Sequence, residues 1–343
     1  MDSSLHLQKK LIPDIFEVMQ KRYNILRTIR TMQPVGRRSL SLKLNVTERT
    51  LRSEVEFLKD QNLILIASSG MTLTSEGDEL LDKLQGVIRQ LSGIDEMERL
   101  LREKLQLDEV IIVNGNSDDS PWVIDELGRA GAARMKSSLS GNNIIAVTGG
   151  SSMAAVANML PKVSELSNVD DIVFVPARGG LGKGAKLQAN TVCEQMAEKM
   201  HARYRVLYVP DNLSETAYLT LTSEPSIREV LELLKSSNIV MHGIGDAETM
   251  ASRRKISEEE RKVLRDAKAC GEAFGYYFDE NGNIIQKVHT IGLQLKDLSG
   301  VEHVIAVAGG SSKAKAIKAY IKMAPQKPVL ITDEGAATEL LKG

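Results

Sequence analysis

The chain has 343 residues, of which 42% are hydrophobic and 26% charged, and its formal net charge is −1. This composition excludes an intrinsically disordered chain, and no apolar run approaches the ~20 residues that a membrane-spanning helix needs. We therefore expect a cytoplasmic protein with no membrane association, long enough for two domains with substantial cores.

The charge is distributed unevenly along the chain. Residues 1–75 contain 12 Lys and Arg against 7 Asp and Glu, a net charge of +5, and the remaining residues contain 32 against 38, a net charge of −6. A basic N-terminal module is thus joined to an acidic one, and a basic module is a candidate for binding a polyanion.

The basic module begins with apolar residues at helical spacing over residues 14–26, and Pro34 and Gly36 then interrupt the pattern. Residues 37–44 follow as a short helix, Asn45 and Val46 as a tight turn, and residues 47–61 as a second helix capped by Thr47. Two short helices joined by such a turn, the second basic near its start, are typical of a helix-turn-helix.

Two short strands, residues 63–66 and 71–74 around a turn at residues 68–70, follow the second helix as the wing of a winged helix-turn-helix. A small helical bundle with merely solvated charges is the alternative, but the turn, the basic helix and the hairpin together favour DNA binding. We assign residues 1–91 to this domain. The sequence does not tell which residues of the exposed face contact bases and which contact phosphates. The candidate DNA contacts on this face are Arg37, Arg38, Thr47, Arg49, Thr50, Arg52 and Ser53.

The joint between the modules begins with Ser75-Glu76-Gly77-Asp78, which fits a capping box. Apolar residues then recur seven apart, at Leu80, Val87, Ile94 and Leu101. This stripe favours a dimerising segment over simple packing on the next domain, and paired half-sites on DNA require paired reading helices. We assign residues 92–107 to a helical linker.

The acidic module, residues 108–343, alternates strands with helices, which predicts a doubly wound, mainly parallel α/β domain. We expect strands at residues 110–113, 144–147, 172–175, 205–209, 239–243, 304–307 and 329–332, with helices around residues 125–135 and from Ser151 onward. In such a sheet, ligands bind beyond the carboxyl ends of the strands.

One strand-to-turn phrase occurs twice at such ends: residues 145–152 read IAVTGGSS and residues 305–312 read IAVAGGSS. Glycines admit close backbone approach, serines add hydroxyl donors, and a helix N-terminus favours anions. Each copy therefore predicts a site for a phosphate, the first at Gly149, Gly150, Ser151 and Ser152 and the second at residues 309–312. The second copy adds Lys313. The alternative is that each phrase only turns a strand into a helix. Neither copy is a dinucleotide fingerprint or a P-loop.

Further cations suggest a ligand with more than one phosphate. Arg178 lies in a glycine-flanked loop, and Arg253 and Arg254 follow the Gly-Ile-Gly turn at residues 243–245. Gln188 and Glu272 are candidate partners of sugar hydroxyls. The two cysteines, Cys193 and Cys270, lack metal-ligand spacing, so we expect reduced thiols and no metal site.

Several longer phrases resemble the sugar-binding domain of the SorC/DeoR-type bacterial transcription regulators, and the resemblance covers nearly the whole chain. They are SPW at 120–122, VTGG at 147–150, FVPARGGLG at 174–182, QANT at 188–191, HGIG at 242–245, EAFGYYF at 272–278, AGGSSK at 308–313, and, in the basic module, GRRSL at 36–40 and GMTLT at 70–74.

The resemblance implies that the α/β domain shares the sugar-phosphate isomerase and deaminase fold but acts as a sensor, with no catalytic residues, no cofactor, and fructose-1,6-bisphosphate as effector. It implies an effector site made by Ser151, Ser152, Arg178, Gln188, Arg253, Glu272 and Lys313. It also implies a repressor of a glycolytic operon that includes glyceraldehyde-3-phosphate dehydrogenase, in a low-GC Gram-positive bacterium. Homo-oligomers, dimers or tetramers, would form on the operator DNA and loosen when the sugar binds. Ser151-Ser152 departs from the expected Thr-Thr, which keeps the hydroxyls.

Two other classes of function compete with a sensor. A sugar-phosphate isomerase or deaminase fused to a DNA-binding module would need a carboxylate base, for which Asp246, Glu272 or Asp333 could serve. An interaction scaffold would carry the sugar-binding fold without a ligand. The attached winged helix makes a sensor sufficient, so we favour it.

Overall fold

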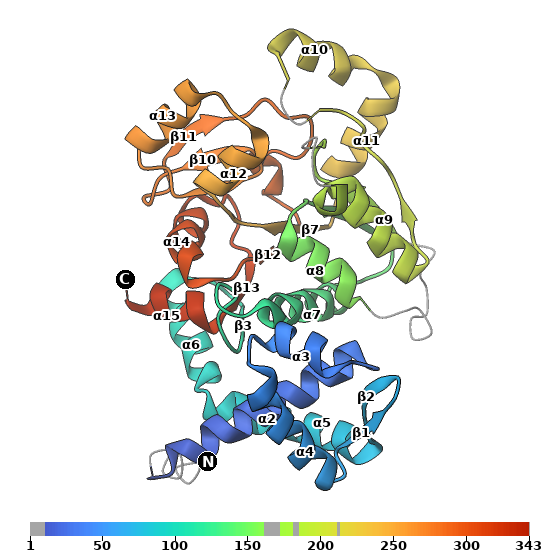
Figure 1. The fold of residues 1–343 in the computed structure, drawn as a ribbon. Helices are drawn as coiled ribbons and strands as arrows, with labels where there is room; N and C mark the ends of the chain where they lie inside the picture. Colours follow the sequence, from blue (N-terminus) through green and yellow to red (C-terminus); the bar gives the residue numbers. More distant parts are fainter. Residues whose placement is uncertain (1–10, 161–171, 181–184, 211–212, 343) are drawn as a thin grey trace. The chain divides into compact units, whose positions relative to one another are not determined.

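The computed structural model describes residues 11–160, 172–180, 185–210 and 213–342 (Figure 1). The chain divides into two compact units, one formed by residues 1–97 and 119–122, the other by residues 98–118 and 123–343. Among the described residues, no helix is both long and apolar enough to cross a bilayer.

In the described part of the first unit, helices pack against a two-stranded sheet: α2 (Pro13–Met32), α3 (Arg37–Leu44), α4 (Glu48–Asp60), β1 (Ile64–Ala67), β2 (Gly70–Leu73) and α5 (Ser75–Leu91). The strands pair antiparallel around Ser68 and Ser69. The predicted helix-turn-helix and hairpin are thus present. Thr47 caps α4 as expected, its hydroxyl accepting a hydrogen bond from the N–H of Thr50 at 3.2 Å.

The apolar stripe after the hairpin packs within its own chain. Leu80 of α5 is half-buried against the core of the first unit, to which its neighbour Leu81 belongs, and Ile94 and Leu101 of α6 (Ile94–Leu105) are fully buried. The cap of α5 differs from the prediction. It is Thr74, one residue before Ser75, because the Thr74 hydroxyl accepts from the N–H of Gly77 at 2.9 Å. The predicted dimerisation stays a prediction.

The second unit is built on a seven-stranded parallel sheet of order β3-β13-β12-β7-β4-β5-β6. Its strands are β3 (Val110–Val113), β4 (Asn143–Val147), β5 (Ile172–Pro176), β6 (Arg203–Tyr204), β7 (Ile239–Gly243), β12 (His303–Val307) and β13 (Val329–Asp333). All the pairs are parallel, as the alternating pattern predicted. Near-continuous apolar strands such as Ile172–Pro176 are buried on both faces.

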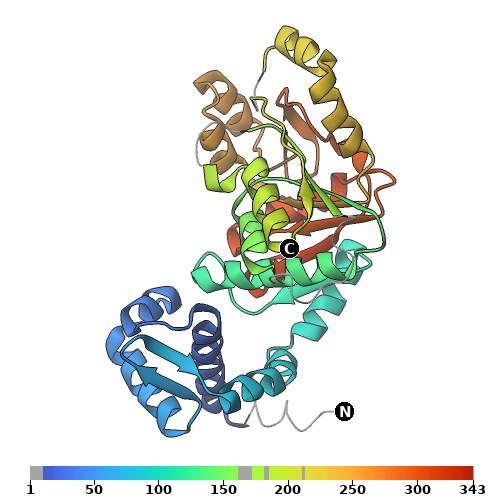
Figure 2. The ribbon, with the colours of Figure 1, turned by 90° about the vertical axis from the view of Figure 1, so that its right-hand side faces the viewer.

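Helices lie on both faces of this sheet (Figures 1 and 2). On one face α7 (Pro121–Ser137), α8 (Ser151–Met159) and α9 (Ala189–Met200) form a core with inward residues of the strands, among them Val147, Phe174 and Met241. The remaining helices are α10 (Glu215–Ser223), α11 (Pro225–Lys235), α12 (Ala247–Arg254), α13 (Glu258–Asp266), α14 (Ala314–Met323) and α15 (Glu334–Lys342).

The predicted strand at residues 205–209 is wrong, because only Arg203 and Tyr204 form the edge strand β6. The reason is a side chain. Asn190 of α9 donates to the carbonyl of Leu207 at 3.0 Å and accepts from its N–H at 2.8 Å, so an amide occupies the backbone groups that a strand would use.

A small antiparallel sheet adjoins the carboxyl ends of the large one and was not predicted. Its order is β11-β10-β9-β8, with β8 (Gly245–Asp246), β9 (Gly271–Ala273), β10 (Tyr276–Phe278) and β11 (Ile284–Lys287). Phe274 and Gly275 form the two-residue turn between β9 and β10, both with positive φ, 53° and 85°. A bulky residue in the left-handed region is strained.

Candidate DNA interface and effector pocket

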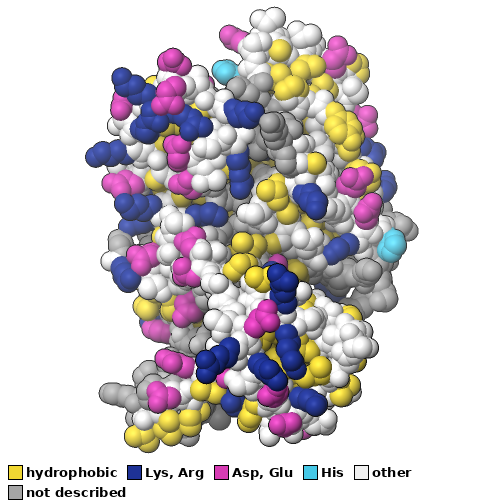
Figure 3. Space-filling view, in the orientation of Figure 1, with side chains coloured by type: hydrophobic (Ala, Val, Ile, Leu, Met, Phe, Trp, Pro, Cys, Tyr) yellow, Lys and Arg dark blue, Asp and Glu magenta, His cyan; other side chains and the backbone are white. Residues whose placement is uncertain are grey.

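The predicted DNA contacts all lie on the solvent-exposed surface of the first unit: Arg37, Arg38, Thr47, Arg49, Thr50, Arg52 and Ser53. Their positions follow from packing, because Leu51, Val55 and Leu58 turn the opposite face of α4 into the core. Arg52 pairs on the surface with Glu56 at 3.0 Å, an exposed contact that costs little to displace. Figure 3 shows Lys and Arg side chains gathered on the face that carries α3. This face suits a polyanion.

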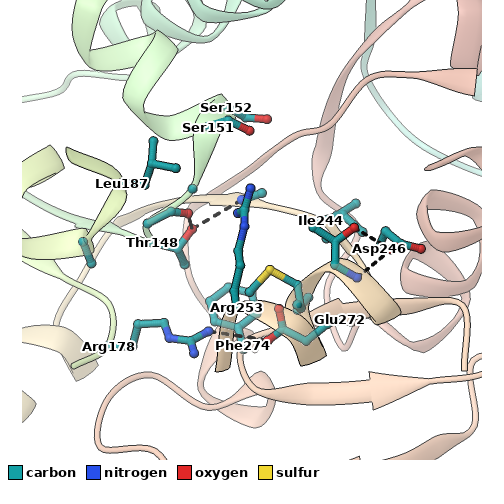
Figure 4. Close-up of a pocket in the computed structure, with 18 of the residues that line it drawn as sticks. Thr148, Ser151, Ser152, Arg178, Leu187, Ile244, Asp246, Arg253, Glu272 and Phe274 are labelled. Carbon is teal, nitrogen blue, oxygen red and sulfur yellow. Dashed lines mark hydrogen bonds and ion pairs between the residues drawn. The ribbon is translucent and has the colours of Figure 1, made fainter. Parts of the chain in front are cut away.

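The second unit contains a cavity of about 470 Å³ at the carboxyl ends of its strands. Lining residues come from the ends of β4, β5 and β7, from α12 and from the β9–β10 turn (Figure 4). Every residue predicted for the effector site lines it: Gly149, Gly150, Ser151, Ser152, Arg178, Gln188, Arg253, Glu272 and Lys313. The sheet thus brings together residues that are up to 164 positions apart in the chain, from Gly149 to Lys313.

The first glycine turn opens toward this cavity. The Gly150 N–H donates to the carbonyl of Leu187 at 2.8 Å, whereas a Cβ built on Gly150 would meet nothing within 4 Å. Ser151 and Ser152 begin α8, and among the described residues no side chain accepts a hydrogen bond from their backbone N–H groups. Helix N-terminal donors with open space before them form an anion site.

The second glycine turn differs from the prediction, because the chain fills it with its own carboxylate. Asp118, in the loop between β3 and α7, accepts from the N–H and the hydroxyl of Ser312 at 2.8 and 3.0 Å, and from the hydroxyl of Ser311 at 3.0 Å. A Cβ on Gly310 would lie 2.5 Å from Asp118 Oδ1. The two Gly-Gly-Ser-Ser turns therefore differ, because the second holds Asp118 and no described side chain takes that place at the first.

The buried carboxylate of Asp333 and the amide of Asn116 hold the loops on both sides of that contact. Asp333 accepts from the N–H groups of Gly310 and Ser117, each at 2.8 Å, and Asn116 accepts from the N–H of Ser311 at 3.2 Å. Burial alone would raise the pKa of Asp118, but the hydrogen bonds from Ser312 and Ser311 and the charge of Lys313 lower it, so Asp118 is ionised at neutral pH.

Glu272 lies on the floor of the cavity between two arginines. Its Oε1 accepts from Arg254 Nη2 at 2.8 Å and from the N–H of Gly275 at 2.6 Å, and Arg178 Nη1 lies 3.5 Å away. Burial would raise the pKa of Glu272, but Arg254 and Arg178 bring it below its ordinary value. Arg254 also donates to the Tyr277 hydroxyl at 3.0 Å. A charged acceptor is thus fixed in the cavity wall.

The cationic side chains lie on the other walls of the cavity. In Figure 4, Arg253 extends from α12 toward the end of α8 that carries Ser151 and Ser152. Lys313 is half-buried, and burial lowers its pKa against the opposing effect of Asp118. Because cations and N–H groups line one cavity together with the acceptor Glu272, the arrangement suits a ligand with phosphoryl and hydroxyl groups.

Thr148, Leu187 and Phe274 also line the cavity and were missed. Behind Phe274 lies His242, which is fully buried, its ring centroid 4.8 Å from that of Phe274, with a hydrogen bond of 3.0 Å to the Tyr320 hydroxyl. Two of the three had a signal in the sequence, Thr148 by its position at a strand end and Phe274 within the phrase EAFGYYF. In the described part of the chain, no three His, Cys, Asp or Glu side chains cluster as metal ligands do.

Comparison with protein families gives two matches. Residues 89–342 match the family model described as "Putative sugar-binding domain", and residues 18–88 match "CggR N-terminal DNA binding domain". The two models follow each other along the chain and together cover most of it.

Curated relatives match over the full length. The central glycolytic genes regulator of Priestia megaterium is 53% identical over 100% of this chain and 99% of its own, and that of Bacillus subtilis is 52% identical over the same shares. Among solved structures, a "putative SorC family transcriptional regulator" from Enterococcus faecalis matches with a TM-score of 0.67 and 43% identity, covering 72% of this chain and 99% of that one.

Proposed function

The chain belongs to the SorC-type family of the central glycolytic genes regulators, and from this premise we propose that it represses a glycolytic operon until fructose-1,6-bisphosphate binds to it. It is a DNA-binding transcriptional regulator with a sugar-binding domain, not an enzyme. We further propose that it acts in the cytoplasm and that the operon includes glyceraldehyde-3-phosphate dehydrogenase.

The charge distribution of the cavity carries the proposal for the effector. One backbone cradle at Ser151 and Ser152 offers N–H and hydroxyl donors for a first phosphate. Arg253 and Lys313 can neutralise a second one, and Glu272 can accept from hydroxyls between them. A bisphosphorylated sugar satisfies all three, whereas a monophosphate leaves cations without a partner.

Calorimetric titration tests this effector. We expect fructose-1,6-bisphosphate to bind more tightly than fructose 6-phosphate, and to lower the affinity of the protein for operator DNA. Linkage requires that the DNA lower the affinity for the sugar by the same factor. Equal binding of both sugars, or no effect of the bisphosphate on DNA binding, would refute the proposed effector.

The sugar-phosphate isomerase or deaminase alternative needs one of three candidate bases. Asp246 lines the cavity, but it caps α12, its Oδ1 accepting from the N–H and the hydroxyl of Thr249 at 2.8 and 2.7 Å. Asp333, one candidate base, is fully buried and accepts the N–H groups of Gly310, Ser117 and Ala336. Glu272 is held by arginines that stabilise its charged form, which makes it a poor proton acceptor. Incubation with fructose 6-phosphate, ribose 5-phosphate and glucosamine 6-phosphate should give no turnover.

A further inference from the structure

We infer that Asp118 is a positioning residue for the effector site: its carboxylate occupies the second Gly-Gly-Ser-Ser turn as a ligand would, and thereby fixes Lys313 toward the cavity. The inference rests on the proposed function, because it concerns how the same pocket holds a phosphorylated sugar.

The two Gly-Gly-Ser-Ser turns have the same sequence but different surroundings. Both follow strands that flank β7, and both place a glycine with positive φ before two serines, Gly150 at 116° and Gly310 at 101°. At the first turn no described residue lies within 4 Å of a Cβ built on Gly150, whereas the second turn holds Asp118 Oδ1 and Oδ2. A carboxylate from a loop 194 positions away thus takes the place that an anionic ligand takes at the first turn.

Asp118 also holds the second turn in its conformation. Ser311, Ser312 and Lys313 form one turn of 3-10 helix, too short to be stable by itself, and none of its three residues is fully buried. Three hydrogen bonds from Ser311 and Ser312 to Asp118 hold it. Because Lys313 is its last residue, the same contacts fix the origin of the lysine side chain.

Asp118 also stabilises the charged form of Lys313. The groups that act on Lys313 are the carboxylates Asp118, Asp333 and Asp246 and the cation Arg253. Burial disfavours the charged ammonium, and Asp118 is the first of the carboxylates that favour it. Asp118 therefore supports Lys313 in two ways, by conformation and by charge, and it does not itself line the cavity.

If Asp118 acted only by direct charge repulsion of the ligand, the result would be the opposite of that expected for positioning. A carboxylate near a phosphate site repels the ligand, so its neutralisation alone would strengthen binding. If Asp118 positions Lys313, Asp118→Asn should weaken the binding of fructose-1,6-bisphosphate at least about threefold, within the coupling range of neighbouring residues. Ser312→Ala changes no charge and should weaken binding in the same direction.

The experiment is a double-mutant cycle by calorimetry on the full chain, with Asp118→Asn, Lys313→Ala and the double variant. The matched control is Asp297→Asn, because Asp297 also caps a 3-10 turn in this unit, accepting from the N–H of Gln294 at 2.8 Å, and does not line the cavity. We expect Asp118→Asn to have no further effect once Lys313 is removed, and the control to bind like the wild type.

Three outcomes would overturn the inference. They are tighter binding by Asp118→Asn, an equal loss with and without Lys313, and unchanged binding by both Asp118→Asn and Ser312→Ala. If Asp118→Asn fails to fold, Ser312→Ala decides alone. A wild-type protein that does not bind fructose-1,6-bisphosphate would overturn the proposed function as well, whereas wild-type binding with unchanged variants overturns this inference only.

Discussion

Replacement of His242 by Gln should remove a large part of the pH dependence of stability in the second unit. His242 is fully buried, and burial lowers its pKa from the ordinary 6.5 to about 4, against the opposing effects of the Gly243 carbonyl and Glu272. As the pH falls below 6.5, the unfolded chain therefore binds a proton at this position and the folded chain does not. The free energy of unfolding is therefore not reduced by this histidine above pH 6.5, and it decreases as the pH falls from 6.5 toward 4.

The two pKa values give the magnitude. The difference between the pKa values of His242 in the unfolded and folded chains corresponds to a maximum loss of about 3 kcal/mol in the free energy of unfolding. Between pH ~7.5 and pH ~5 this loss amounts to about 2 kcal/mol. Gln keeps polar atoms near the Tyr320 hydroxyl but cannot titrate. Its absolute stability will be lower, so the quantity of interest is the change between the two pH values.

Hydrogen exchange of the β7 and β12 amides measures this change, because it reports the opening free energy of this unit separately. Wild type should lose about 2 kcal/mol more than His242→Gln on acidification. His303→Gln, at the partly exposed start of β12, is the matched control and should keep the wild-type profile. Parallel profiles of wild type and His242→Gln would refute the reasoning, since the titrating group would then lie elsewhere.

Three further predictions follow from the surface, the pocket and the thiols. Arg49→Ala with Arg52→Ala should weaken operator binding and reduce the slope of log K against log salt by about 2, and an unaltered slope in gel-shift titrations would remove α4 from the DNA contact. Arg253→Ala should reduce the effector affinity by about 1.5–3 kcal/mol in calorimetry, while exposed Arg228→Ala on α11 should not, and equal values would place the site elsewhere. Cys270, whose pKa burial raises to about 11, should react with iodoacetamide at neutral pH far more slowly than the unfolded chain, and rapid alkylation would contradict this burial.

Local patterns predicted most of the fold. Strand ends such as Val147 and Val307 were placed correctly, because a short apolar run that ends in Gly-Gly leaves the chain few conformations. Leu51, Val55 and Leu58 fixed the orientation of α4 by their spacing alone. These are contacts within a few positions, where spacing and side-chain chemistry decide the conformation.

Contacts between distant residues explain what was missed. Helix α5 is capped by Thr74 rather than Ser75, and the N–H of Leu207 bonds to Asn190 rather than to a strand. In both cases several polar groups could accept from the same N–H, and the local sequence pattern does not decide which one does. Asp118 was invisible for the same reason, since its partners lie 194 positions away. The family resemblance identified residues that line the pocket, but it gave no information on residues such as Asp118 that hold them in position.

The edge of the large sheet has one more consequence, for association between molecules. A long outer strand in a parallel sheet would present a row of unpaired donors and acceptors to any neighbouring chain, which is the usual route to aggregation. Here β6 has two residues, and the backbone groups of Leu207 beyond it are taken by Asn190. A neighbouring molecule therefore finds few unpaired backbone groups at this edge, so Asn190→Ala should leave the protein in solution when dilute but make it precipitate on concentration, as light scattering would measure.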